Sequence, residues 1–540
     1  MLWSLLLTTA AVQAAVLPYI QPNPCDDGVR NANHIFNAIH SSMRQWGSSL
    51  NHNGMSLFLA QVPAGTQFYH GSPKQEPVEG MEWLAFEPEH AINFASRMKH
   101  PPPPPPDKPG MMEMSLDESR SCKAGLEEHC RGHLTDHRFP QSPIMEGGDD
   151  RKSAPRPRPN PMEAGWLHTY RTKTLTPLLY IDGMSAGKCE KGTLDTQDVL
   201  LLNARNESQG MFWERERAER LCKMAAQTWN GKIKGFIRME AGFEIIMCSF
   251  AKNLDFLQAV RAGSIAPDGE EPPPDDRFFG DRNIWDWVQA IAARYDGIGG
   301  GRVKLNYDRF VTSYHYDLDL FTGDDGLPRL ENIPVSSLDK IRDDIHSMVN
   351  DWDPSINLYE EKAIDWQKVA DMVVERYAKE LKYLVSGALT EPEEFFHELV
   401  RILRVFVDSD ARNTTAEVDR CVAQMIPIEY DVSCSVAGRA VHSVARTICS
   451  ALFAAFDAHV PLLDTMDNLR SLIEYLDWTV WKRCPECPLG TVCFIPVWPF
   501  GTTEDHEHPQ CRNASELEGR RGYWGSLRPR QMEPGLKYFP

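Results

Sequence analysis

The chain has 540 residues, which is enough for about two to four domains, and its formal net charge at pH 7 is −19. An acidic surface argues against a nucleic-acid-binding protein, which needs a basic face to displace counterions, and equally against docking on anionic lipid. The composition therefore favours a globular protein whose acidic surface serves solubility.

The first residues predict export. Residues 1–15 read MLWSLLLTTAAVQAA, an apolar run followed by small residues, with Val12 and Ala14 at the −3 and −1 positions of a signal-peptidase site. No stretch reaches the roughly 20 apolar residues that a transmembrane anchor needs. Three sequons for N-glycans agree with a secreted, extracellular glycoprotein: Asn206, Asn413 and Asn513. The thirteen cysteines predict disulfide bonds, and because the number is odd, at least one must stay free or pair between chains.

The fold class predicted for residues 25–265 is α+β, because strand-like and helical patterns alternate there. Before residue 100 we expect a helix at 33–46, strands at 56–62 and 66–70 around a Pro-Ala-Gly turn, an extended piece at 83–86 and a short helix at 91–98. After residue 161 we expect strands at 166–170 and 178–182, a helix at 213–229, strands at 233–239 and 243–250, and a helix at 254–262.

Residues 100–161 are predicted to form a disordered insertion in this α+β domain. Six consecutive prolines, Pro101–Pro106, precede charged, Pro-rich and Gly-rich sequence that cannot bury enough apolar surface to fold. Cys122 and Cys130 could bridge each other and close a local loop within it.

The C-terminal half is predicted to be mainly helical. An acidic, Pro-rich linker at 266–282 leads to a helical domain at 283–482, in which apolar side chains recur at helical spacing, as at Trp366, Val369 and Val373. A tail rich in Cys and Pro follows at 483–540, and its four cysteines begin with a zinc-like spacing. Because disulfides form in an oxidising compartment, two bridges are the favoured interpretation, and no metal site is predicted.

Three short segments point to chemistry. Tyr69–Ser72 (Tyr-His-Gly-Ser) ends one predicted strand, Trp83–Phe86 lies in a second strand ahead of a helix, and Glu244 opens a third, apolar strand. This order resembles the diphtheria-toxin-like branch of the ADP-ribosyltransferase superfamily, which includes the poly(ADP-ribose) polymerases, over roughly residues 55–260. The family's usual middle tyrosine is replaced here by Trp83 or Phe86, and the second and third segments are more widely separated than in compact members.

The resemblance implies a secreted NAD-dependent protein that transfers ADP-ribose to an unidentified acceptor or to water. Breaking the nicotinamide–ribose bond creates an oxocarbenium-like centre, which the carboxylate of Glu244 would stabilise. His70 would act beside it by holding the adenosine-side ribose. Gly71, lacking a side chain, would let the backbone bond the nicotinamide carboxamide. The implied cofactor-binding set is His70, Gly71, Ser72, Trp83 and Phe86, with one aromatic stacked on the ring.

Two other functions stay open. The chain could be a non-catalytic secreted binding protein on the same fold, since inactive family members commonly lose one of the three positions. It could also be a serine hydrolase, because Gly183-Met-Ser185-Ala-Gly187 follows a predicted strand as in a nucleophile elbow. The residues after Gly187 are polar and show no helical pattern, whereas an elbow needs a helix there. NAD is the expected small-molecule partner, with no metal cofactor, and the oligomeric state is open.

Overall fold

A computed structural model describes residues 29–98, 162–205, 214–263, 281–323, 325–361, 363–426, 435–458, 460–517 and 522–523. Several predictions from the sequence lie outside these residues: the signal peptide at 1–15, the insertion at 100–161 with its possible bridge, the sequon at Asn206 and nearly all of the linker at 266–282.

The N-terminal region is α+β, as predicted. Its elements before the insertion are α1 (Ala32–Ser41), α2 (Gln45–Leu50), β1 (Ser56–Val62), β2 (Gln67–Ser72), β3 (Glu82–Ala85), α3 (Pro88–Ile92) and β4 (Ser96–Met98). After it come β5 (Met162–Ala164), β6 (Trp166–Thr172), β7 (Thr176–Ile181), a π-helix (Asp195–Leu201), α4 (Glu214–Gln227), β8 (Gly235–Glu240), β9 (Gly242–Met247), α5 (Phe250–Asn253) and β10 (Leu254–Arg261).

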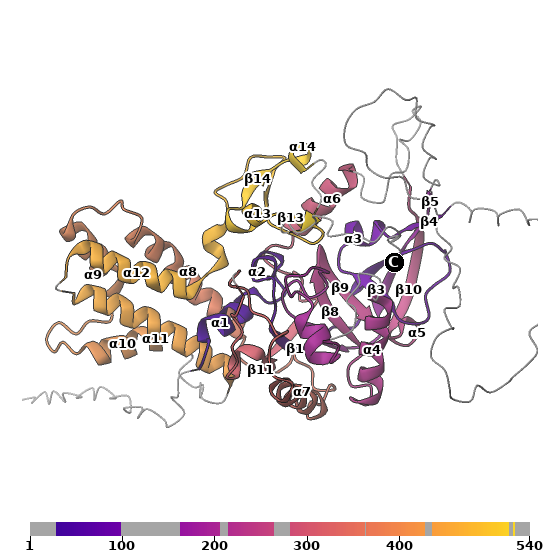
Figure 1. Ribbon diagram of the computed structural model, residues 1–540, viewed down its shortest axis with the longest axis horizontal. Helices are drawn as coiled ribbons and strands as arrows, with labels where there is room; N and C mark the ends of the chain where they lie inside the picture. The colour runs from indigo at the N-terminus through magenta and orange to yellow at the C-terminus, as the bar shows by residue number, and fades with distance from the viewer. Residues whose placement is uncertain are drawn as a thin grey trace, which may run out of the picture.

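One curled, nine-stranded sheet organises this region, with strand order β10-β6-β2-β3-β9-β8-β7-β1-β11 (Figure 1). All neighbouring strands run antiparallel except β7 and β8, which are parallel. The strands β1, β7, β8 and β9 are buried along their whole length, in agreement with their mostly apolar sequences, although β8 and β9 also bury charged residues. Burial of these four strands places the core of the region under the middle of the sheet.

The ninth strand, β11 (Lys304–Thr312), comes from beyond the linker and pairs with β1. It lies in the part of the chain predicted to be a helical domain, so the sheet crosses the boundary predicted near residue 282. The helix α6 (Asp281–Ala292) precedes it, and α7 (Val335–Asn350) packs against it. The N-terminal region and the beginning of the C-terminal half therefore share one core.

Three predicted helices differ in the structure. The helix expected at 254–262 is wrong: this segment is β10, which pairs with β6 over almost its whole length, because the sheet offers it an unpaired edge. The helix expected at 33–46 is two helices, separated at 42–44, where Met43 has a φ of 54°. The helix expected at 91–98 ends at Ile92, and its last residues form β4, paired with β5.

The C-terminal half is mainly helical, as predicted. Its long helices are α8 (Trp366–Leu384), α9 (Pro392–Leu403), α10 (Thr414–Ala423), α11 (Val436–Phe456) and α12 (Leu462–Leu476). Each buries one apolar stripe, and α11 also packs against α1, which joins the bundle to the α+β region (Figure 1).

The Cys-rich tail folds back over α2 and α6. Its short elements are β12 (Val492–Phe494), β13 (Phe500–Gly501), α13 (Thr503–Glu507), β14 (Gln510–Arg512), α14 (Ala514–Leu517) and β15 (Gly522–Tyr523). Two disulfides, Cys484–Cys493 and Cys487–Cys511, confirm the prediction for these cysteines. Two more join α4 to the residue after β9 (Cys222–Cys248) and α10 to α11 (Cys421–Cys449).

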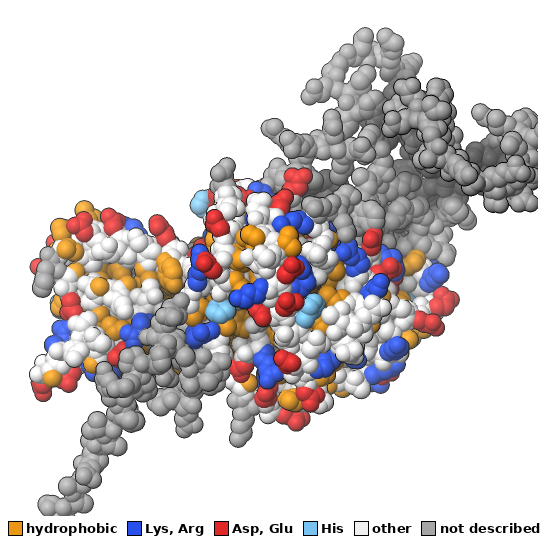
Figure 2. Space-filling view, turned by 60° about the horizontal axis from the view of Figure 1, so that its bottom comes forward, with side chains coloured by type: hydrophobic (Ala, Val, Ile, Leu, Met, Phe, Trp, Pro, Cys, Tyr) orange, Lys and Arg blue, Asp and Glu red, His pale blue; other side chains and the backbone are white. Residues whose placement is uncertain are grey.

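Charged side chains of both signs are interspersed over the face of the molecule in Figure 2, and hydrophobic side chains gather at its helical end. None of the helices in the described parts of the chain combines the length and the hydropathy of a bilayer-spanning segment.

Candidate functional site

The three segments that carry the predicted chemistry lie on neighbouring strands. In the sheet, β3 lies between β2 and β9, and Ala85 is opposite both Tyr69 of β2 and Glu244 of β9. The pairing of β2 with β3 is limited to this one position, so the two strands separate on either side of it. Segments as far apart in sequence as residues 69 and 244 are thus brought within two strands of each other.

His70 lies beside this junction. Its Nδ1 is 2.8 Å from the carbonyl oxygen of Trp83, and its ring packs against Phe250 and His168. Burial lowers the pKa of His70 to about 4, so the imidazole is neutral and Nδ1 donates to the carbonyl. Successive side chains of a strand point to opposite faces. The side chain of His70 therefore projects from the face of the sheet opposite to that of Tyr69 and Glu244. The structure does not bring the side chains of His70 and Glu244 onto one face.

Gly71 lies on the face of Glu244, where α3 covers it closely. A Cβ atom at this position would be 2.1 Å from the carbonyl oxygen of Ala91 and 2.8 Å from the backbone of Phe94 and Ala95. Only glycine therefore allows α3 and the turn after it to pack on β2. The neighbouring Ser72 is buried, and its hydroxyl accepts a hydrogen bond from the backbone N–H of Lys74.

The two candidate aromatic residues have different surroundings. Trp83 is half-buried on the same face as Glu244, and the guanidinium of Arg215 lies 5.9 Å from its ring centre. Phe86 is fully buried and packs edge-on against Phe68 and Phe243. Trp83 is therefore the aromatic residue that could meet a ligand near Glu244, while Phe86 belongs to the core.

Glu244 belongs to a buried group of charged side chains that the sequence analysis did not anticipate. Its carboxylate pairs with the guanidinium of Arg238 on the adjacent strand β8, and Arg238 also pairs with Glu214 at the start of α4. Lys188 donates to Glu240 at 2.8 Å and lies 3.7 Å from Glu214. The members of this ion cluster are His90, Lys188, Glu214, Arg238, Glu240 and Glu244.

The charges of the ion cluster do not cancel. Glu214, Glu240 and Glu244 carry three negative charges when ionised, whereas Lys188 and Arg238 carry two positive charges. A pair next to the cluster, Arg217 with Asp198 at 2.8 Å, is balanced; Arg217 also lies 3.9 Å from Glu214, but adding this pair leaves the sum of charges unchanged. One negative charge is thus left in a region where ions are poorly solvated, which disfavours full ionisation of all three carboxylates.

The pKa values follow from this imbalance. Burial raises the pKa of Glu240 to about 7, and the attraction of Lys188 only partly offsets this effect. Burial also acts to raise the pKa of Glu214, but the adjacent Arg238 and Lys188 lower it to about 2. Burial lowers the pKa of His90 to about 4, although Glu244 favours its protonation. At neutral pH His90 is therefore uncharged, and Glu240 holds a proton more readily than Glu214 does.

His90 comes from α3 and reaches the sheet over Gly242. A Cβ at Gly242, which has a φ of 121°, would be 2.6 Å from Nδ1 of His90, so this glycine makes room for the imidazole. His90 is 3% exposed, and within the described part of the chain its Nδ1 has no hydrogen-bond partner. The sequence held a signal for this cluster: Arg238, Glu240 and Glu244 interrupt two otherwise apolar strands at positions that share one face.

Ser185 does not have the geometry of a nucleophile elbow. Its side chain is 1% exposed, and its hydroxyl donates to the carbonyl oxygen of Ile181 at 2.7 Å. The next helical element along the chain begins only at Asp195, so no helix follows the serine directly. A buried and bonded hydroxyl without a following helix is not exposed for attack on a substrate.

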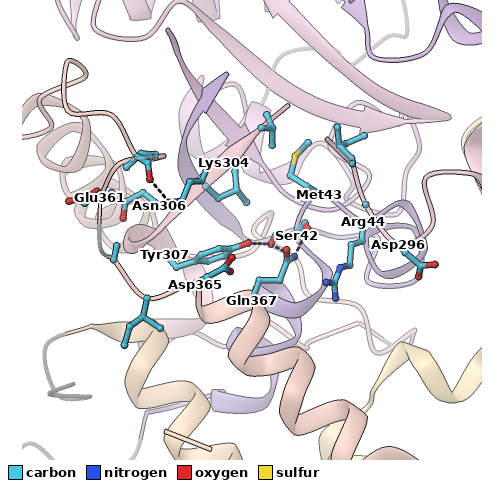
Figure 3. Close-up of a pocket in the computed structure, with 18 residues that line it drawn as sticks. Ser42, Met43, Arg44, Asp296, Lys304, Asn306, Tyr307, Glu361, Asp365 and Gln367 are labelled. Atoms are coloured by element: carbon cyan, nitrogen blue, oxygen red, sulfur yellow. Dashed lines mark hydrogen bonds between the residues drawn. The ribbon is translucent and has the colours of Figure 1, made fainter. Parts of the chain in front are cut away.

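A cavity of about 410 Å³ lies where the turn between α1 and α2 meets β11 and the start of α8 (Figure 3). Tyr307 and Ser42 share a hydrogen bond of 2.8 Å, and Gln367 donates to the carbonyl oxygen of Ser42. Arg44 is held by a two-point ion pair with Asp371. These polar groups of the wall are already bonded within the protein, and none of the predicted site residues lines the cavity.

Comparisons with known proteins extend over most of the chain. YOR389W, an uncharacterized protein of Saccharomyces cerevisiae, is 26% identical over 555 aligned residues, which cover 88% of this chain and 84% of the relative. YPL277C, also an uncharacterized protein of this yeast, is 32% identical over 266 residues, which cover 46% of this chain and 48% of the relative. A family model described as the YPL277C N-terminal domain matches residues 24–274. No solved structure matches the chain.

Proposed function

We propose that the protein is ADP-ribosyltransferase-like and that it binds NAD on the face of the sheet formed by β2, β3 and β9. The observation that carries the proposal is the strand order: the three segments of the resemblance occupy adjacent strands, although Tyr69 and Glu244 are 175 positions apart in sequence. Gly71, Trp83 and Glu244 share the face that α3 covers. The proposal includes transfer of ADP-ribose to an acceptor or to water.

In this proposal Glu244 is the catalytic carboxylate. Loss of nicotinamide leaves positive charge on the ribose, and a fixed carboxylate stabilises that charge most effectively in a region that excludes water. The ion pair with Arg238 fixes the orientation of the Glu244 carboxylate. His70 acts as a positioning residue, because its bond to the Trp83 carbonyl ties β2 to β3 beside their single paired position.

Nicotinamide release from NAD tests the proposal. The purified, glycosylated protein is expected to release nicotinamide, and Glu244→Gln is expected to lower the rate by about 100-fold or more. Glu89→Gln makes the same change on the exposed side of α3 and should leave the rate unchanged. A parent protein without turnover, or equal rates for the parent and Glu244→Gln, would contradict a catalytic role for this carboxylate.

A second candidate, a non-catalytic binding protein on the same fold, is favoured by the burial of Glu244. The side chain of this residue is 8% exposed and paired with Arg238, and the backbone of α3 lies against Gly71. Calorimetric titration with NAD separates the two candidates: saturable binding without nicotinamide release supports the binding protein. The absence of both binding and release would argue against an NAD site of either kind.

We also propose that the protein is secreted. The four disulfides support maturation in an oxidising compartment. Asn413 and Asn513 use their side-chain oxygens to accept backbone N–H groups, which leaves the amide nitrogen of each for a glycan. Recovery of the protein from culture medium, with a mass decrease after glycosidase treatment, is the expected result. Retention of an unglycosylated chain inside the cell would contradict it.

A further inference from the structure

The ion cluster contains three side chains whose donor atoms converge on one point. One ligand atom each of His90, Glu240 and Glu244 lies within 4.8 Å of the other two, and all three residues are at most 6% exposed. We propose that these residues bind one divalent transition-metal ion, with Zn²⁺ as the ion that fits best. The sequence alone predicts no metal at these residues.

The imidazole of His90 has a buried nitrogen that is available to a metal ion. Its Nδ1 is buried and has no hydrogen-bond partner among the described residues, which for a buried polar atom calls for an explanation. Leaving such an atom unpaired costs about 1–3 kcal/mol. A metal ion would take up a nitrogen lone pair of the neutral imidazole, and Gly242 provides the space in which the ring stands.

Each of the two carboxylates has one oxygen bonded to a cationic side chain. Lys188 donates to one oxygen of Glu240, and Arg238 donates to one oxygen of Glu244. The hydrogen bonds of the described residues reach Oε2 of Glu240 and Oε1 of Glu244, and none of them reaches the second oxygen of either carboxylate. Fixing one oxygen orients the other, as outer-shell donors do in metal sites. The excess of one negative charge in the ion cluster also favours an added cation.

The donor set selects the ion. One imidazole and two carboxylates suit Zn²⁺ and, less well, Mn²⁺, whereas Ca²⁺ and Mg²⁺ prefer oxygen ligands alone. Two other groups in the described residues could compete for zinc. Cys484, Cys487 and Cys511 are closed by disulfides, and Glu504, Glu507 and His508 are exposed on and beside α13. The buried site differs from the cysteine group because its ligand atoms are not held in disulfides, and from the α13 group because its residues are at most 6% exposed.

The site has a consequence that rests on the proposed function. A metal ion bound to Glu244 would occupy the carboxylate that is proposed to stabilise the ribose cation. Zinc is therefore expected to inhibit NAD cleavage, and chelation is expected to restore it. Metal binding itself does not depend on catalysis, so the two proposals can fail separately.

Calorimetric titration of the metal-free, oxidised full chain with ZnCl₂ tests the site. We expect one tight equivalent of zinc, which His90→Gln and Glu240→Gln each weaken by about tenfold or more, while His508→Ala leaves it unchanged. Thermal melting in the absence of zinc verifies that each variant folds. Equal affinity in the parent and both cluster variants, loss of the tight equivalent in His508→Ala, or no binding by the parent would overturn the proposal.

X-ray absorption at the zinc edge identifies the ligand atoms in the parent protein, so this test does not depend on whether the variants fold. The zinc-loaded parent is expected to show nitrogen and oxygen ligands with one imidazole, and a sulfur shell would overturn the proposal in favour of the tail cysteines. Nicotinamide release, measured in parallel, separates the two proposals. If the protein binds zinc as expected but does not cleave NAD, the metal site is supported and only the proposed catalytic function is contradicted.

Discussion

At the scale of single residues, the site is governed by charges that are buried together. Arg238 is fully buried between Glu214 and Glu244, and its Nη1 also donates to the side-chain oxygen of Gln197 at 2.7 Å. Burying an ion is tolerable only when partners replace its water, and each partner here depends on the others. The cluster therefore couples β8, β9 and α4 through a few contacts.

Removal of Arg238 tests this coupling. Arg238→Met would leave Glu214 and Glu244 buried without their shared cation, and we expect the free energy of unfolding to fall by about 3–5 kcal/mol. Arg215→Met is the matched control, because Arg215 is 54% exposed and pairs with Glu82 at the surface, where about 0–1 kcal/mol is expected. Urea unfolding measures both; similar losses in the two variants would show that the buried pair has no special role.

Asp182 gives a prediction for pH. Burial raises the pKa of its carboxyl to about 7, from 3.8 as the ordinary value, while the backbone N–H of Ser56 donates to it and partly offsets the shift. The folded state holds this proton more tightly than the unfolded chain, so stability from Asp182 is greatest below about pH 4 and is lost as the pH rises to about 7. Above pH 7 the loss is complete, at up to about 4 kcal/mol.

Asp182→Asn should remove this dependence, because the amide keeps the oxygen that Ser56 bonds and has no proton to lose. The difference in unfolding free energy between this variant and the parent is expected to widen from pH 4 to pH 7 and then to stay constant. Asp255→Asn, at the surface of β10, controls for the loss of a carboxylate. A constant difference over the whole range would mean that Asp182 is ionised in the folded protein at acidic pH.

At the scale of elements, α4 is held to the sheet by one covalent link. The disulfide Cys222–Cys248 joins this helix to the residue that follows β9, and α4 carries Glu214 and Arg217 into the region of the ion cluster. The position of these charges therefore depends on the docking of the helix.

The double variant Cys222→Ala/Cys248→Ala should lose about 3 kcal/mol of unfolding free energy, since the bridge closes a loop of 26 residues. It should also lose the rigidity of α4, visible as faster hydrogen exchange in this helix and in β9. Cys189→Ala is the control, because Cys189 is the free cysteine of the described residues, and less than about 1 kcal/mol is expected. Unchanged exchange in α4 would show that packing alone fixes the helix.

At the scale of the whole molecule, the C-terminal half supplies a strand to the sheet and covers a helix of the N-terminal region. β11 covers the outer side of β1, although the region that matches the family model ends at residue 274. The helix α1 packs against α8 and α11 of the bundle. A chain cut at residue 274 would therefore expose β1 as an unpaired apolar edge and uncover α1.

A fragment of residues 1–274 is accordingly expected to aggregate or to lack a cooperative thermal transition, whereas the full chain should unfold cooperatively. Near-ultraviolet circular dichroism during heating compares the two. A soluble fragment that melts within a few degrees of the full chain would show that the N-terminal region has a complete core of its own.

The sequence predicted most local structure near the site correctly. The strands β1, β2, β3, β8 and β9 and the helix α4 follow from apolar runs, β-branched and aromatic residues and a Pro-Ala-Gly turn, which act over a few neighbouring residues. It also predicted two disulfides among the four tail cysteines, because the predicted signal peptide implies an oxidising compartment, where cysteines form bridges. β10 was missed because its pattern is compatible with a helix, and only the free edge of β6 decides in favour of a strand.

The sequence by itself thus determined the α+β class of the N-terminal region, the helical C-terminal half and the bridged tail, since these depend on local periodicity and composition. Only the tertiary structure decided which charged side chains meet. Glu244 was named from the sequence, but Arg238, Lys188 and His90 come from other elements, and their partners are fixed by strand register and by the docking of α3. Register also placed His70 and Glu244 on opposite faces, because a shift of one residue reverses the direction of every side chain in a strand.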